Sequence, residues 1–246
     1  MSDRLACEER GLERVLGWFG DGTLVRPDHE APSFVDLVRA LARAAGTTAV
    51  PADGGAARLS ETIGAPEHLV FILIDGLGDE QLAAAKTAPF LKAHVTERVQ
   101  SVFLSTTAAA VTSLATAQWP SSHSVPSWWF RLEDHDTTAV PLPFRERGTG
   151  RKLEELGVRP SEVFPVPSIW PTFKRDLVTV TPAHYLESVY SNYTSGGTRR
   201  LGYDGVEHAL ELAATAVREA TAPSLTYLYL PQYDSTAHER GTLHDE

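Results

Sequence analysis

The sequence predicts an α/β fold with a mostly parallel sheet and helices on both faces. The stretch His68–Ile74 is continuous and apolar, as in a strand that is covered on both faces, and Leu225–Leu230 is predicted to be the last strand. Between residues 206 and 217, apolar side chains recur at helical spacing and form one stripe. Strands that alternate with amphipathic helices are typical of a parallel sheet.

Residues 1–66 are predicted to form an N-terminal leader region of helix and loop, and residues 67–246 the α/β domain. Behind Ser33, a good N-cap residue, apolar side chains from residue 34 to 45 recur with a helical period. The Gly- and Ala-rich stretch Gly46–Ala57 then predicts a surface loop.

The α/β domain is predicted to contain further elements between its two strongest strands. The expected helices are Glu80–Lys86, Thr106–Thr116 and Arg151–Leu156, and the expected strands are Val99–Leu104, Glu162–Val166 and Leu177–Val180. A Pro-rich and aromatic loop is expected from Trp119 to Phe144.

Composition excludes several classes of partner. The formal net charge is −10, from 32 acidic and 22 basic residues, which argues against nucleic acid or an anionic membrane as the main partner. Small anionic substrates remain compatible, because a bound dication reverses the local field. The single cysteine excludes an intrachain disulfide and a Cys-based structural zinc site. The N-terminus lacks the apolar core of a signal peptide and the longest apolar run is too short to span a bilayer, so a soluble cytoplasmic protein is expected.

Polar residues follow the predicted strands. Asp75 and Asp234 come directly after the two strongest strands, and Thr107 follows a third candidate. In α/β folds, ligands bind beyond the carboxyl ends of the strands. The three residues are therefore expected to meet at one edge of the sheet.

Each of these residues also has a simpler explanation. Asp234 and His238 are four apart, so a helix would bring both to one face, where they can grip a cation or merely be surface neighbours. Asp75 could cap the following helix. Thr107 could be a plain N-cap, or a nucleophile whose hydroxyl is ionised by a metal at a helix N-terminus.

Three segments resemble the nucleotide pyrophosphatase/phosphodiesterase family of the alkaline phosphatase superfamily. Residues 69–78 (LVFILIDGLG) resemble its first strand and metal-binding aspartate. Residues 103–107 (FLSTT), with 112–116 and 119–123, resemble its nucleophile segment. Residues 229–241 (YLPQYDSTAHERG) are similar to its second metal motif.

The resemblance implies an alkaline-phosphatase-like fold and a metal-dependent hydrolase of phosphodiester or pyrophosphate bonds. It implies two divalent ions, usually zinc, with manganese or magnesium as alternatives. Asp75 and Thr107 belong to one ion, and Asp234 and His238 to the other. Thr107 is the implied nucleophile, with Thr106 as the fallback, and the implied substrate is a small phosphate ester or nucleotide. A phosphomonoesterase or phosphomutase on the same fold is the alternative, and a catalytically inactive fragment is another.

The sequence departs from the family pattern in two places. Ala110 stands where many relatives carry an asparagine that helps to hold the phosphate. The family also places an Asp-His pair and a further histidine well downstream of Asp234, and they have no counterpart before Glu246. The chain is therefore expected to be the front portion of a longer enzyme, with a fold incomplete at the C-terminus.

Three further features have open interpretations. His123 is expected to pack in a loop rather than bind metal. The tryptophans at 128 and 129 either pack or stack on a nucleobase. Residues 195–200 (SGGTRR) form either a plain turn or an anion contact.

Overall fold

The computed structural model describes residues 2–24 and 31–242, and the chain divides into two compact units, Met1–Ala31 and Pro32–Glu246. The first unit contains the helix α1 (Ser2–Gly20). The predicted division at residue 66 stays a prediction. What the structure adds is that the helices α2 (Phe34–Ala44) and α3 (Gly54–Ile63) belong to the same compact unit as the sheet.

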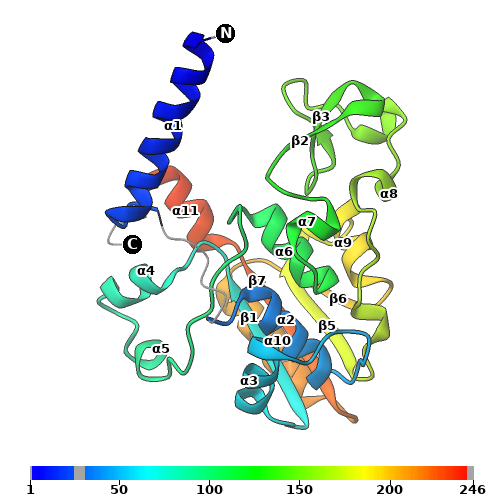
Figure 1. Cartoon of the computed structure of the whole chain (residues 1–246). Coiled ribbons are helices and arrows are strands. Elements are labelled where there is room, and N and C mark those ends of the chain that lie inside the picture. Colours follow the sequence, from blue (N-terminus) through cyan, green and yellow to red (C-terminus); the bar gives the residue numbers. More distant parts are fainter. Residues whose placement is uncertain (1, 25–30, 243–246) are drawn as a thin grey trace. The chain divides into compact units, whose positions relative to one another are not determined.

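The centre of the second unit is a four-stranded sheet in the order β1-β7-β5-β6 (Figure 1). Its strands are β1 (His68–Ile74), β5 (Asp176–Pro182), β6 (Arg199–Tyr203) and β7 (Ser224–Leu230). All three pairings in this sheet are parallel. The predicted α/β class and the mostly parallel sheet are confirmed.

Helices cover both faces of the sheet, as predicted. On one face, Val180 and Leu228 pack against alanines of α10 (Val206–Arg218). On the other face, Leu225 and Tyr227 belong to a core cluster with side chains of α2 and of α6 (Thr107–Thr116). The second face is the one that carries the candidate site.

The helix α2 begins with a reciprocal cap. The Ser33 hydroxyl accepts a hydrogen bond from the Asp36 backbone N–H at 3.1 Å, and the Asp36 carboxylate accepts one from the Ser33 N–H at 2.9 Å. The apolar stripe predicted behind this cap lies in the core, where Val35 and Val38 are fully buried. The neighbouring helix α3 replaces the end of the loop that was predicted for residues 46–57.

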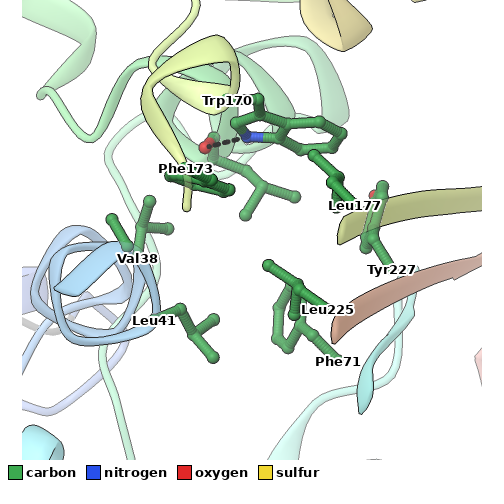
Figure 2. A pocket seen from close by; sticks show the side chains of 10 residues that line it. Val38, Leu41, Phe71, Trp170, Phe173, Leu177, Leu225 and Tyr227 are labelled. Carbon is green, nitrogen blue, oxygen red and sulfur yellow. Dashed lines mark hydrogen bonds between the residues drawn. The ribbon is translucent and has the colours of Figure 1, made fainter. Parts of the chain in front are cut away.

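A small apolar cavity of about 20 Å³ lies between α2 and the sheet (Figure 2). Val38 and Leu41 line it from the helix, and Phe71 and Leu225 line it from the strands. Trp170 closes another side and donates its indole N–H to the Leu114 carbonyl at 3.2 Å, the dashed line in Figure 2. All of the side chains that line it are apolar or aromatic.

Two predicted strands are wrong. Residues 99–104 form only an isolated bridge between Gln100 and Ser33, and Phe103 is 79% exposed. The apolar side chains of this segment are therefore mostly not buried in a sheet, as a strand assignment would require. Residues 160–163, within the second predicted strand, instead form the helix α8 (Pro160–Val163), which starts with proline. The Glu162 carboxylate accepts a hydrogen bond from the backbone N–H of the N-cap residue, Arg159.

The predicted Pro-rich loop contains a second, antiparallel sheet in the order β2-β3-β4 (Phe130–Leu132, Thr137–Val140 and Arg145–Glu146). The other helices of the second unit are short. They are α4 (Asp79–Ala84), α5 (Pro89–Ala93), α7 (Pro120–His123), α9 (Val189–Ser195), α11 (Gln232–Arg240) and 3-10 turns at 133–135, 153–156, 170–172 and 183–185. Across the described ranges, no helix is both long and apolar enough to cross a membrane.

Candidate active site

The four residues singled out in the sequence line one pocket of about 660 Å³. Asp75 follows β1, Thr107 begins α6, and Asp234 and His238 lie on α11. Leu114, Trp170 and Tyr227 line both this pocket and the small cavity of Figure 2, so they form the wall between the two. Three stretches that are distant in sequence therefore meet at one edge of the sheet, as predicted.

Strand register brings the two aspartates together. Ile74 and Leu230 are paired at the ends of adjacent parallel strands, and the Asp75 N–H donates to the Leu230 carbonyl at 2.9 Å. Gly76 follows with a φ of +74°, and a Cβ added there would lie 3.0 Å from the Asp234 Cα. The glycine thus permits both a left-handed turn and direct backbone contact between the two aspartate segments.

The edge of the pocket is electrostatically negative. Burial and the nearby Asp75 carboxylate raise the pKa of Asp234, and His238 partly offsets this. Burial, Asp75 and Asp234 raise the pKa of Tyr185, another residue that lines the pocket. Two carboxylates that repel each other at the rim of a pocket are the arrangement that a cation relieves.

Tyr229 holds one of these carboxylates in place, a role that the sequence did not predict. Its hydroxyl donates to Asp75 Oδ2 at 2.6 Å across the β1–β7 pairing. Burial, and then Asp75, raise the pKa of Tyr229, so the tyrosine is a neutral donor. The only sequence signal was the alternation of Tyr227 and Tyr229 on β7, which places both on the pocket face.

His238 lies four residues after Asp234 on α11, with its Nε2 3.7 Å from Asp234 Oδ1. The pair lies on a helix, the arrangement that brings both side chains to one face. The His238 side chain is 81% exposed, while that of Asp234 is 31% exposed. The imidazole is therefore at the outer rim of the pocket and the carboxylate is further inside.

The register at the helix α6 favours Thr107 over Thr106. Thr107 is the first helical residue and lines the pocket, together with Val111 and Leu114 on the same stripe. Thr106 is the N-cap, yet its side chain makes no capping hydrogen bond, and its Oγ1 is buried without a partner. Ala110 packs against the core.

His123 packs in the interior, as predicted. It is fully buried, its Nε2 lies 3.0 Å from Ser113 Oγ, and its Nδ1 accepts the Val125 N–H at 3.2 Å. Because Nδ1 is an acceptor, Nε2 carries the proton and donates to Ser113. Burial lowers the pKa of His123 to about 4.

The structure separates the remaining candidates. Trp128 lines the pocket, whereas the Trp129 ring packs under the guanidinium of Arg147 at 4.0 Å. In the segment 195–200, Gly196 and Gly197 form the turn, with positive φ. Arg200 belongs to the unpredicted strand β6 and lines the pocket.

The donor set is compatible with divalent cations, although it is sparse. The four candidate residues supply two carboxylates, one hydroxyl and one imidazole to the pocket, which His184 also lines. Zinc, manganese and magnesium all bind such groups, with different preferences for nitrogen and oxygen. Within residues 2–24 and 31–242, no group of three or more His, Cys, Asp or Glu side chains is close enough to hold a metal ion.

Fold and site together define an α/β protein with an acidic pocket at the carboxyl edge of a parallel sheet. The model of the family described as Type I phosphodiesterase / nucleotide pyrophosphatase matches residues 69–246, and the chain belongs to this family. The predicted resemblance is thereby confirmed. The family is generally metal-dependent and acts on small phosphodiester or nucleotide substrates. Comparisons with curated proteins and with solved structures gave no match.

Proposed function

We propose that this pocket hydrolyses phosphodiester or pyrophosphate bonds of small substrates through Thr107. The observation that supports this most is that Asp75, Thr107, Asp234 and His238, from three separate stretches, line one pocket. A volume of about 660 Å³ suits a small phosphodiester or a nucleotide. Family membership supports the hydrolysis of phosphodiester bonds.

Two divalent cations, zinc or else manganese or magnesium, fit the donors at the rim. Asp75 and Thr107 would hold one, and Asp234 and His238 the other. The raised pKa of Asp234 reflects burial and then repulsion by Asp75, and the attraction of a nearby cation would offset both. When bound, the cations supply a lowered pKa for the attacking hydroxyl and charge neutralisation at the phosphoryl oxygens.

The residues of the chain divide the remaining work. The Thr107 oxygen attacks phosphorus in line with the departing oxygen, so a phospho-threonine forms and water then cleaves it. Tyr229 orients the Asp75 carboxylate through its 2.6 Å hydrogen bond. The apolar stripe below Thr107 and the wall formed by Trp170 limit the access of water from the interior side. A cytoplasmic location stays a prediction from the sequence.

Turnover assays test this proposal. The diester 4-nitrophenyl thymidine 5′-phosphate should be hydrolysed with added zinc or manganese, and faster than the monoester 4-nitrophenyl phosphate. Thr107→Ala should lower the rate by roughly 1000-fold or more, while Thr106→Ala, one residue outside the pocket, should not. A faster monoester reaction would favour the phosphomonoesterase alternative. Diester turnover that survives in Thr107→Ala would refute the assignment of the nucleophile.

Cation binding tests the carboxylates independently of turnover. Asp75→Asn and Asp234→Asn should each weaken manganese binding, measured by titration calorimetry, because each removes a charge that offsets the lost hydration of the cation. The matched control is Asp176→Asn, which removes the same charge at the opposite end of the sheet. Equal affinity in all three variants would contradict a cation site at the pocket rim.

A further inference from the structure

The inner half of the pocket has a polar floor that the proposed chemistry does not use. On the sheet, Thr179 is paired with Arg200 on one side and with Tyr227 on the other. Paired residues of a parallel sheet project from the same face, and all three line the pocket. A row of side chains therefore crosses the floor, well inside the rim that carries Asp75.

Thr179 is unsatisfied in this position. The residue is only 7% exposed, and its Oγ1 is buried without a hydrogen-bond partner. A buried hydroxyl that lacks a partner is unfavourable, and native structures keep few of them. Thr181 follows on the same face, one row nearer the rim, and it also lines the pocket. Side chains of α6 and α9 line other sides of the same pocket.

Arg200 brings a positive charge to the same floor. Its Nη1 donates to the Leu186 carbonyl at 2.5 Å and to Asn192 Oδ1 at 2.8 Å. Both acceptors are neutral, and over the described part of the chain no ion pair is recorded for Arg200. The guanidinium is therefore held in place by two contacts while its charge stays uncompensated.

We propose that this inner floor binds a second anionic group of the substrate, a phosphate or a carboxylate. The proposal rests on the proposed function, because it places the reacting phosphoryl group at the rim with Thr107. The substrate class is then a phosphodiester or pyrophosphate with a further negative charge on the arm that enters the pocket. Phe71, in the row of Thr179 and Tyr227, precedes Asp75 by four residues, so this row lies about 13 Å from Asp75 along the strands. Arg200, at the far end of the row, is also three strands across the sheet, about 14 Å to the side.

Binding of simple probes tests this inference without turnover. With manganese present, 1,6-hexanediol bisphosphate should bind about tenfold or more tightly than hexyl phosphate, as expected for one added charged hydrogen-bonding pair. Arg200→Gln should abolish this preference and leave the affinity for hexyl phosphate unchanged. Arg200→Lys should retain part of the preference, because the charge stays and the planar fork is lost.

Arg199→Gln is the matched control. It removes the same charge from the adjacent residue of β6, whose exposed side chain projects from the other face of the sheet. The preference for the bisphosphate should persist in this variant. Thr179→Val should weaken bisphosphate binding without loss of thermal stability, because the removed hydroxyl has no partner within the protein.

Three results would overturn the inference. The first is an equal affinity of the wild-type chain for both probes. The second is a preference that survives in Arg200→Gln, and the third is an equal loss of both probes in that variant, which indicates a structural role only. Failure of the proposed function has a different signature: the diester is not hydrolysed, whatever the two probe affinities are.

Discussion

Acidification from pH 6.5 to pH 4 should destabilise the protein through His123. Burial lowers the pKa of this histidine from 6.5 to about 4, so the folded chain keeps it neutral while the unfolded chain protonates it. The unfolded state therefore binds more protons in this window, so the free energy of unfolding decreases as the pH is lowered. Above pH 6.5 both states are neutral and the effect vanishes.

The magnitude follows from the difference of about 2.5 between the two pKa values. At 1.36 kcal/mol for each unit, His123 removes about 3 kcal/mol of unfolding free energy by pH 4. This is a large share of the 5–15 kcal/mol that is typical of folded domains. Hydrogen bonds from Thr149 and Thr137 and the ion pair with Arg151 lower the pKa of Glu146 from 4.5 to about 2. The stability that this carboxylate contributes is therefore lost between pH 4.5 and about 2, mostly below the window of His123.

Urea denaturation at pH 7.5, 5.5 and 4.5 measures the slope. His123→Gln removes the titrating group but retains a donor toward Ser113. The variant should be less stable than the wild-type chain at pH 7.5, because a buried, well-packed ring is lost. Its free energy of unfolding should then change little between pH 7.5 and pH 4.5. His208→Gln, on the exposed surface of α10, is the control and should keep the slope of the wild-type chain. If His123→Gln loses as much stability on acidification as the wild-type chain, buried His123 is not the cause.

Two further substitutions probe the geometry of the rim. Gly76→Ala should cost about 1–3 kcal/mol in thermal or urea denaturation and weaken manganese binding, because the new Cβ enters a left-handed turn and lies 3.0 Å from the Asp234 Cα. Gly148→Ala, also at positive φ but with no atom within 4 Å of the added Cβ, should cost stability alone. Tyr229→Phe should leave the fold intact and lower manganese affinity by about tenfold, because Asp75 loses its orienting hydrogen bond; an unchanged calorimetric affinity would exclude this role.

The sequence predicted the strands that are richest in apolar residues. β1 and β7 appear at the predicted positions, although Val70 and Ile72 of β1 are exposed and β1 is therefore not covered on both faces. β6 was missed because its residues, such as Arg200 and Gly202, line a pocket or permit close packing and leave no apolar pattern. The predicted strand at 99–104 failed for the opposite reason: most of its residues are apolar, but only Val102 among them is buried.

Some residues of the candidate site could be predicted from the sequence and others could not. Asp75, Thr107 and Asp234 follow or begin regular elements, so their common edge was predictable from the α/β pattern and from the family resemblance. Tyr229 and Thr179 could not be found in this way, because their roles depend on which strands are neighbours. The order β1-β7-β5-β6 places Tyr229 next to Asp75 and Thr179 next to Arg200. Strand order is a property of the whole sheet and is not written in any single segment.

The two ends of the pocket have opposite charge, and their separation lets cation binding at the rim and anion binding at the floor be measured separately. The backbones of Arg200 and Asp75 are about 13 Å apart along the strands and three strands apart across the sheet, which gives roughly 20 Å in all, about twice the Debye length at 0.1 M salt. The charge of Arg200 therefore adds little to the field at Asp75 and Asp234. Arg200→Gln should leave manganese affinity unchanged, whereas Asp75→Asn should reduce it. A ligand that engages both ends must carry its two anionic groups at a matching distance, so the spacing selects the substrate more strongly than its total charge does.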